Sequence, residues 1–344
     1  MGDALIRMLA AVLAVCFLTA VPAHAAAADD ERMEKLFTFK DPRITESSGL
    51  AVSPTHPGIY YTHNDSAAAP TFYAVDGQGR TQATYQLRGA EARDWEAMAA
   101  SKDPRTGRGV LWFADIGDNL DGAWPDVSIY KVMEPQRLGD ATLPAVRYRF
   151  RYADGARNAE GVMVNPRTGR LYVVSKEFAG SVYAAPKTLR TDRTNVLRRV
   201  AAAPIMATDA AYAPDGSSYV VRTYFSATLY KPSGETIARV TMPQLEQAES
   251  IAFTADGKAL LTGSEGVRSP VYRVPLPARA LASASPSATP TPIPTPRPAK
   301  AESSLDAQAD SAVGGGLALK DVLIWLAAAA TAIGVITFIA RRTA

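Results

Sequence analysis

The sequence predicts an all-β fold: a β-propeller of five four-stranded blades closed by an N-terminal strand, followed by a C-terminal transmembrane helix. Three observations lead to this prediction. A short motif with a polar residue before a small one recurs five times, and each copy is followed by further β-rich runs separated by turn residues. One unmatched β-rich run precedes the first copy. Four strands repeated about every 40–50 residues are typical of propeller blades.

The repeated motif is clearest when its copies are aligned on their small residue. The copies are SSGLAV (47–52), WEAMAA (95–100), AEGVMV (159–164), TDAAYA (208–213) and AESIAF (248–253). The residues directly before the small residue are Ser48, Glu96, Glu160, Asp209 and Glu249. Their spacings are 48, 64, 49 and 40 residues, and the longest contains an insertion, DIGDNLDGAWPD (115–126).

Each copy continues into further predicted strands, as the third shows. The turn NPRTGR (165–170) leads into RLYVVSKE (170–177), and then SVYAAPK (181–187) and NVLRRVAA (195–202) follow. Turn residues between such runs indicate antiparallel hairpins.

The fifth unit lacks a fourth run, whereas KLFTFK (35–40) precedes the first unit without a partner. We therefore expect KLFTFK to pair with the run around VYRVPL (271–276). That pairing would close a propeller domain over residues 35–277.

The N-terminus has the order of a secretory signal peptide over residues 1–25. Arg7 precedes a short apolar core, and Ala23-His24-Ala25 is a small-x-small cleavage site. An uncleaved anchor is the alternative, but the core is short for a membrane span. The one cysteine, Cys16, lies inside this segment, so the expected mature chain has no disulfide or thiol chemistry.

The C-terminus predicts a membrane anchor. Residues 278–320 form a linker rich in Pro, Ser and Ala. Residues 321–340 contain an uncharged apolar run long enough to cross a bilayer, and Arg341-Arg342 in the tail (341–344) should stay cytoplasmic. The predicted localisation is a cell membrane, single-pass, with the propeller outside the cytoplasm. The net charge of +3, without a Lys/Arg run, argues against nucleic acid as a partner.

First strands of propeller blades line the central channel, so the five motif positions should form a ring near one mouth. Residues two positions earlier, such as Asp94 and Asn158, point the same way along a strand. The ends of the second strands add Asp65, Lys176 and Glu265.

Three interpretations of this ring stay open. The acids could form structural ion networks with nearby basic residues. Carboxylate oxygens also suit Ca²⁺, with Glu96, Glu160, Asp209 and Glu249 as candidate metal ligands. Paired carboxylates could instead catalyse hydrolysis, with Asp65, Glu96 and Glu160 as candidate catalytic residues. The oxygen-rich insertion (115–126) is a secondary metal candidate, or simply an Asp/Gly turn.

The first-strand pattern resembles that of secreted bacterial β-propeller proteins of phytase-like or gluconolactonase-like architecture. The matching stretches are Ser48-Gly49-Leu50-Ala51, Glu96-Ala97-Met98-Ala99, Glu160-Gly161-Val162-Met163 and Glu249-Ser250-Ile251-Ala252. The resemblance implies a propeller over residues 35–277 and, as in some of those proteins, calcium in the channel. It brings no family-specific catalytic motif, and those families usually have six blades.

The predicted function is therefore that of a membrane-anchored, extracytoplasmic binding or scaffold protein. Its acidic channel mouth would take an unknown small molecule, glycan or protein and could hold calcium. The alternative is a calcium-dependent hydrolase of phosphoester, lactone or glycoside substrates. The sequence has no nucleophile elbow, phosphate loop or zinc-protease motif, so it leaves open whether the protein is an enzyme.

Overall fold

The computed structural model describes residues 32–65, 69–120, 122–278 and 280–281. The chain divides into two units, residues 1–288 and 289–344, and every described residue belongs to the first. The predicted signal peptide, membrane helix and tail lie outside the described residues, as does most of the linker. Among the described residues no helix has the length and apolar character needed to cross a bilayer.

Twenty β-strands make up the regular structure of the described residues, and they form five four-stranded units, named blades 1 to 5. Blade 1 contains β2 (Ser47–Val52), β3 (Ile59–Asn64), β4 (Thr71–Asp76) and β5 (Thr81–Arg88). Blade 2 contains β6 (Trp95–Lys102), β7 (Gly109–Asp115), β8 (Val127–Met133) and β9 (Ala141–Tyr152). Blade 3 contains β10 (Ala159–Val164), β11 (Leu171–Ser175), β12 (Ser181–Ala184) and β13 (Asn195–Ala202).

The last two blades differ in how they are completed. Blade 4 contains β14 (Ala207–Tyr212), β15 (Tyr219–Thr223), β16 (Ser226–Tyr230) and β17 (Thr236–Thr241). Blade 5 contains β18 (Ser250–Phe253), β19 (Ala259–Gly263) and β20 (Pro270–Pro275), and its outer strand is β1 (Glu34–Thr38).

The pairing of β1 with β20 confirms the prediction that the N-terminal strand pairs with the last strand of the repeat. The strands are antiparallel, with Phe37 opposite Val271 and Thr38 opposite Pro270. Phe37 and Phe39 are buried in a cluster shared with Leu50 of blade 1. The N-terminal strand therefore completes blade 5 and also fills the contact between the last and first blades.

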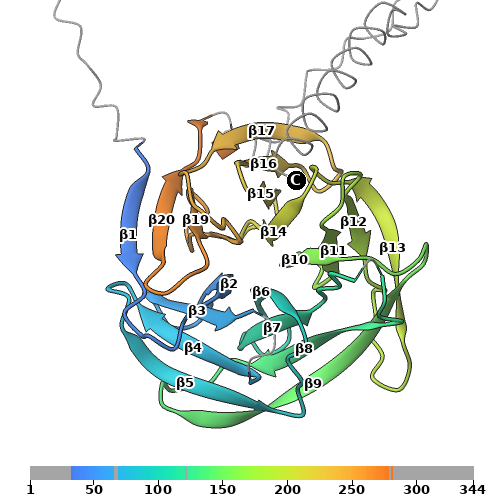
Figure 1. Cartoon of the computed structure of the whole chain (residues 1–344), viewed down its shortest axis with the longest axis horizontal. Coiled ribbons are helices and arrows are strands. Elements are labelled where there is room, and N and C mark those ends of the chain that lie inside the picture. Colours follow the sequence, from blue (N-terminus) through green and yellow to red (C-terminus); the bar gives the residue numbers. More distant parts are fainter. Residues whose placement is uncertain (1–31, 66–68, 121, 279, 282–344) are drawn as a thin grey trace, which may run out of the picture. The chain divides into compact units, whose positions relative to one another are not determined.

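The blades are arranged around a common centre in a propeller-like fold (Figure 1). Their first strands contact one another in cyclic order, from β2 through β6, β10, β14 and β18 back to β2. Five buried apolar clusters each lie between two neighbouring blades. Burial of both faces of each blade explains why apolar side chains occur on both sides of the inner strands.

The outer strand β9 departs from the simple repeat that the sequence predicts. It is twelve residues long and starts four residues before the expected run AVRYRFRY (145–152). One end pairs in parallel with β5, where Tyr85 lies opposite Ala141, and the other pairs with β13, where Phe150 lies opposite Asn195. Blades 1 to 3 thus share one twelve-stranded sheet, whereas blades 4 and 5 are separate four-stranded sheets. These pairings cover strand edges that would otherwise be exposed.

Candidate functional site at the acidic mouth

The first strands of blades 1 to 4 each contain a β-bulge at the repeated motif. In β6 the register skips Glu96 between Trp95 and Ala97, and in β10 it skips Glu160 between Ala159 and Gly161. A bulge redirects the side chain of the extra residue. Glu96 is only 3% exposed and Glu160 only 2% exposed, so both carboxyl groups are buried where the first strands begin.

Asp209 does not share this position, so the sequence alignment was wrong by one residue in blade 4. It is a regular ladder residue opposite Arg222. Its two carboxylate oxygens accept hydrogen bonds from the backbone amides of Ala210 and Ile251, both at 2.7 Å. Because Ile251 belongs to blade 5, Asp209 joins two blades and has both oxygens occupied.

Thr208 is the bulged residue of blade 4, and it behaves like Ser48 of blade 1. The Thr208 hydroxyl donates to the carbonyl oxygen of Ala248 at 2.7 Å, and the Ser48 hydroxyl donates to that of Glu96. In these two blades the bulged residue thus bonds to the backbone of the next blade, whereas in blades 2 and 3 it is a glutamate.

Three carboxyl groups converge beside the bulge of blade 2. Asp65 follows β3, Asp94 precedes β6, and together with Glu96 they place candidate ligand oxygens within 4.8 Å of one another. Gly117 lies against this group, because a Cβ atom there would overlap Glu96 Oε1 and Asp94 Oδ2. The glycine therefore leaves room beside two of the three carboxyl groups.

Glu160 has one well-satisfied oxygen and one without a partner. Its Oε1 accepts from Lys176 Nζ at 2.8 Å and from Asn158 Nδ2 at 3.4 Å. Its Oε2 has no hydrogen-bond partner among the described residues when the neighbouring carboxyl groups are ionised, and the Glu249 side chain lies close enough to Glu160 to share a proton with it. The Lys176 ammonium lies 5.2 Å from the centre of the Tyr224 ring, and the Tyr224 hydroxyl donates to Glu249 Oε1 at 2.9 Å.

Burial and mutual repulsion raise the pKa values of the two bulged glutamates. For Glu96 burial is the largest cause, followed by the negative charges of Glu160, Asp65 and Asp94. Burial also raises the pKa of Glu160, although the neighbouring Lys176 acts in the opposite direction. At neutral pH the metal-free site therefore retains protons on buried carboxyl groups.

The surroundings add more carboxyl groups. Burial, and then the charge of Glu249, raise the pKa of Glu265 to about 7. Burial alone would lower the pKa of Lys176, but the charge and hydrogen bond of Glu160 have a larger effect and raise it. The ammonium group therefore stays protonated. We name the group Asp65, Asp94, Glu96, Glu160, Glu249 and Glu265 the acidic mouth. Its excess of acids could be relieved by protons or by a bound cation.

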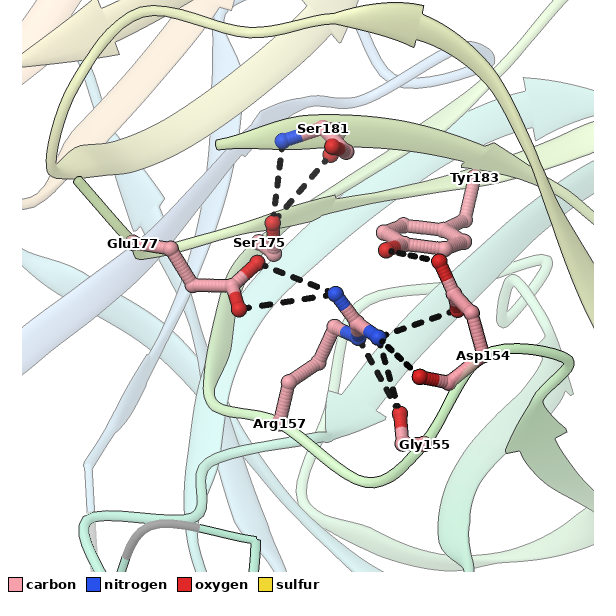
Figure 2. A network of polar contacts seen from close by, with 7 residues as sticks. All are labelled: Asp154, Gly155, Arg157, Ser175, Glu177, Ser181 and Tyr183. Atoms are coloured by element: carbon pink, nitrogen blue, oxygen red, sulfur yellow. Dashed lines mark hydrogen bonds and ion pairs between the residues drawn. The ribbon is translucent and has the colours of Figure 1, made fainter. Parts of the chain in front are cut away.

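An arginine network holds the chain just before Glu160 (Figure 2). Arg157 donates to the carbonyl oxygens of Asp154 at 3.0 Å and Gly155 at 3.1 Å, and it forms an ion pair with Glu177 at 3.3 Å. Its guanidinium lies 4.8 Å from the ring centre of Tyr183, whose hydroxyl donates to Asp154 Oδ2. These contacts fix the connection between β9 and β10 against the β11–β12 loop.

The insertion in blade 2 is organised by Asp118. Its carboxylate accepts from the backbone amides of Ala123 at 3.1 Å and Trp124 at 2.9 Å. The Asp118 amide in turn donates to Asn158 Oδ1 at 2.8 Å. Asp118 therefore anchors its own loop, in the manner of an Asp-capped turn, and positions Asn158 beside the acidic mouth.

The opposite ends of the same first strands line an apolar cavity of about 460 Å³. Each blade contributes to its wall, for example through Leu50, Met98, Val164, Ala210 and Ile251. The described first strands thus surround an acidic region at one end and an apolar cavity at the other.

Comparisons with known proteins add little to this description. No family model and no curated protein matches the chain. A gluconolactonase structure from Xanthomonas campestris is 16% identical, with 64% of this chain and 69% of that chain covered at a TM-score of 0.41. The structure of U3-55K is 10% identical, with 67% and 80% covered at a TM-score of 0.38. At these scores neither likeness bears on function.

Sequence reasoning placed Asp65, Asp94 and Glu96 at one channel mouth, but it named neither Asp94 nor Tyr224 as a candidate site residue. The signal for Asp94 was its place two residues before Glu96, on the same face of the strand. The signal for Tyr224 was its place directly after the second strand of blade 4, which corresponds to that of Lys176 in blade 3.

Proposed function

We propose that this chain is a propeller-like binding protein whose acidic mouth holds a divalent cation, Ca²⁺. The observation that carries the proposal is the convergence of Asp65, Asp94 and Glu96 within 4.8 Å. All donors are carboxylate oxygens, which hard cations prefer, and Ca²⁺ tolerates irregular geometry. The unpartnered Oε2 of Glu160 is a further oxygen near this group. A cation would replace the proton that burial otherwise keeps on Glu96.

The four ligands predicted from the sequence contribute unequally to this proposal. Glu96 belongs to the converging group, and Glu160 adds its unpartnered oxygen. Glu249 lies close enough to Glu160 to influence its ionisation. Asp209 is left out, because backbone amides occupy both of its oxygens.

Calorimetric titration of the chelator-stripped full chain with CaCl₂ tests the proposal. We expect saturable binding that strengthens as the pH rises, because the cation must displace protons. Asp94→Asn combined with Glu96→Gln should abolish binding. Glu235→Gln is the matched control, since this exposed carboxylate pairs with Lys231 away from the mouth. Undiminished binding by the double variant would rule out this site.

A calcium-dependent hydrolase of phosphoester, lactone or glycoside substrates is the second candidate function. The observation favouring it is that Glu160 lies beside the three converging carboxyl groups, and burial raises its pKa. A carboxylic acid that keeps its proton near neutral pH can act as a general acid. A substrate screen with the wild type and Glu160→Gln tests this function, and the absence of any turnover sensitive to that change would exclude it.

We further propose that the chain is anchored in a membrane by residues 321–340, with the propeller outside the cytoplasm. The support is the sequence alone: a signal-peptide pattern at one end, and an apolar run followed by two arginines at the other. Protease added to intact cells should release the propeller by cutting in the linker (278–320). Release only after permeabilisation would show the opposite orientation.

A further inference from the structure

The loops between the second and third strands of blades 2 to 5 share an unusual feature. Each exposes a large apolar side chain: Leu120 (67% exposed), Phe178 (84%), Phe225 (78%) and Val267 (60%). Isolated exposed apolar residues are common on protein surfaces. Their recurrence in the same loop of four blades defines a surface, which we name the apolar rim.

The apolar rim lies at the same end of the blades as the acidic mouth. In each antiparallel blade the second strand ends where the first begins, so these loops gather around the start of the first strands. The loops also carry Glu265, which belongs to the mouth, and Lys176 and Tyr224, which bond to the mouth residues Glu160 and Glu249. Phe178 is two residues after Lys176, Phe225 follows Tyr224, and Val267 is two residues after Glu265.

A neighbouring connection extends the rim. Ile205, in the connection from β13 to β14, is 53% exposed. The adjacent Met206 donates its backbone amide to the carbonyl oxygen of Glu177 at 3.0 Å, which places Ile205 beside the loop of Phe178. The rim is therefore densest where blade 3 meets blade 4.

The charge of the centre indicates what kind of partner would cover this rim. The acidic mouth contains six carboxyl groups, and Glu160 has a buried oxygen without a described partner. Lys176 and Arg93, the cations that act on these carboxyl groups, offset only part of this charge. A partner that places a cation over the mouth and apolar groups on its border would match both features.

We propose that this face docks a partner protein through a basic segment flanked by apolar residues. An Arg or Lys side chain of the partner would enter the acidic mouth, and its apolar neighbours would cover Phe178 and Phe225. The docking surface consists of the acidic mouth, which also contains the proposed cation site, and the apolar rim around it. Calcium and the basic segment should therefore compete for the mouth. Changes in the apolar rim should weaken binding of the segment but not of calcium.

Fluorescence anisotropy with the full chain and three short labelled peptides tests this proposal. The peptides alternate Arg with Leu, Arg with Ser, and Glu with Leu. We expect the Arg/Leu peptide to bind most tightly of the three. Its affinity should decrease as salt is added, because salt screens the attraction between charges. Phe178→Ser combined with Phe225→Ser should weaken its binding about tenfold or more, as truncation of interface anchors does. Both side chains are exposed, so the double variant should fold normally.

Two controls separate this proposal from the cation site. Val200→Ser removes a side chain that is 53% exposed on the outer strand β13, and it should leave peptide binding unchanged. The double Phe variant should also bind Ca²⁺ as the wild type does. Asp94→Asn/Glu96→Gln should weaken binding of the Arg/Leu peptide as well as of Ca²⁺, because both enter the acidic mouth. Undiminished peptide binding by this variant would contradict the placement of the basic side chain in the mouth.

Several results would overturn the docking proposal. Equal binding of all three peptides, or undiminished Arg/Leu binding by the double Phe variant, would show that the rim recognises no basic segment. Pelleting with anionic vesicles without peptide binding would identify a lipid surface instead. Self-association of the chain that the Phe changes abolish would identify a second copy as the occupant.

Discussion

Asp209 and Glu160 show that buried carboxylates of similar sequence context can have different roles. Asp209 accepts two short backbone hydrogen bonds and links blade 4 to blade 5. Glu160 relies on Lys176 and leaves one oxygen without a described partner. A buried polar group without a partner costs about 1–3 kcal/mol. Asp209 thus has a structural role in joining two blades, whereas Glu160 has an oxygen that a ligand could bind.

Replacing each acid by its amide should have different effects on how much calcium stabilises the protein. Asp209→Asn should lower the free energy of unfolding by about 1–3 kcal/mol, because an amide accepts through one oxygen only. The stabilisation by Ca²⁺ should remain in full. Glu160→Gln should reduce that stabilisation, which is about 2.7 kcal/mol at a hundred times the Kd. Urea unfolding in calcium and in chelator measures both, and an unchanged calcium increment in Glu160→Gln would exclude this residue from the site.

Gly117 offers a test that leaves every carboxyl group in place. A methyl group at this position would overlap Glu96 Oε1 and Asp94 Oδ2. Gly117→Ala should therefore weaken Ca²⁺ binding at least tenfold, or about 1.4 kcal/mol. Gly77→Ala is the matched control, because nothing lies within 4 Å of its added methyl group. Calorimetry that finds equal affinities for both variants would contradict the placement of the cation.

At the scale of elements, the connections between strands hold much of the candidate site. The β9–β10 connection is fastened by Arg157, and the insertion between β7 and β8 is anchored by Asp118. The Asp118 amide donates to Asn158, and Arg157 directly precedes Asn158 in the chain. Asn158 in turn donates to Glu160. The position of the bulged glutamate therefore depends on the insertion of blade 2 and on the connection between blades 2 and 3.

Removal of the Arg157 side chain should disturb that arrangement. Arg157→Ala should lower the free energy of unfolding by about 2–3 kcal/mol, because two carbonyl oxygens and Glu177 lose their partner. Arg190→Ala is the control, since its pair with Asp192 is exposed on both sides and should contribute little to stability. Urea unfolding compares the two variants. Equal small effects would mean that the Arg157 network does not stabilise the fold.

The outer strand β1 should contribute strongly to stability. Deletion of residues 34–39 should cost more than about 4 kcal/mol, because it removes the buried Phe37 and Phe39 and exposes the edge of β20. Met33→Ser, a change at an exposed residue just before β1, should have little effect. A deletion variant that melts at the wild-type temperature would show that the pairing of β1 with β20 is not required for the fold.

At the scale of the whole molecule, the ring arrangement collects acids that are far apart in sequence. Asp65 and Glu265, separated by four blades along the chain, interact because blade 5 lies next to blade 1. The three converging carboxyl groups come from two blades, Asp65 from blade 1 and Asp94 and Glu96 from blade 2. The acidic mouth is therefore a property of the assembled propeller-like fold, and its protonation should be linked to folding.

The stability of the calcium-free protein should decrease as the pH rises above 6.5. In the unfolded chain glutamates lose their protons near their ordinary pKa of 4.5, whereas the folded Glu265 keeps its proton up to about pH 7. The raised pKa values of Glu96 and Glu160 extend this difference upward. The folded state thus binds more protons than the unfolded state, so its stability falls with pH.

The melting temperature should be measured above pH 6.5, because below that pH His63 makes stability rise with pH and so masks the effect of the acids. Burial lowers the pKa of His63 from 6.5 to about 4, so its contribution to stability rises between these values and is constant above them. Scanning calorimetry from about pH 6.5 to about pH 8.5 should show a falling melting temperature in chelator and a smaller fall in Ca²⁺. A melting temperature that is flat or rising in chelator would contradict the raised pKa values of the mouth.

Much of the fold follows from local patterns in the sequence. Alternating apolar residues and turn residues identified the five repeated units, and the missing fourth run of the last unit indicated that KLFTFK pairs near Val271. The same repeat identified Glu96 and Glu160 as equivalent residues. The strand predictions succeeded because each depends on neighbours within a few residues, where strand period and turn chemistry act. The long-range pairing followed from the count of strands in each unit, since the last unit lacked one strand and the first β-rich run had no unit.

The sequence by itself therefore determined the repeated strands, the pairing of the chain's first strand with its last, and the presence of acids at the start of the inner strands. Only the tertiary structure decided that Thr208 rather than Asp209 is the bulged residue, because a bulge shifts the register without changing the apolar pattern. It also brought oxygens of Asp65, Asp94 and Glu96 within 4.8 Å of one another, where the sequence indicated only a shared mouth, and it joined three blades through β9. These features arise where different blades meet, and contacts between distant segments leave no periodic signal in the chain.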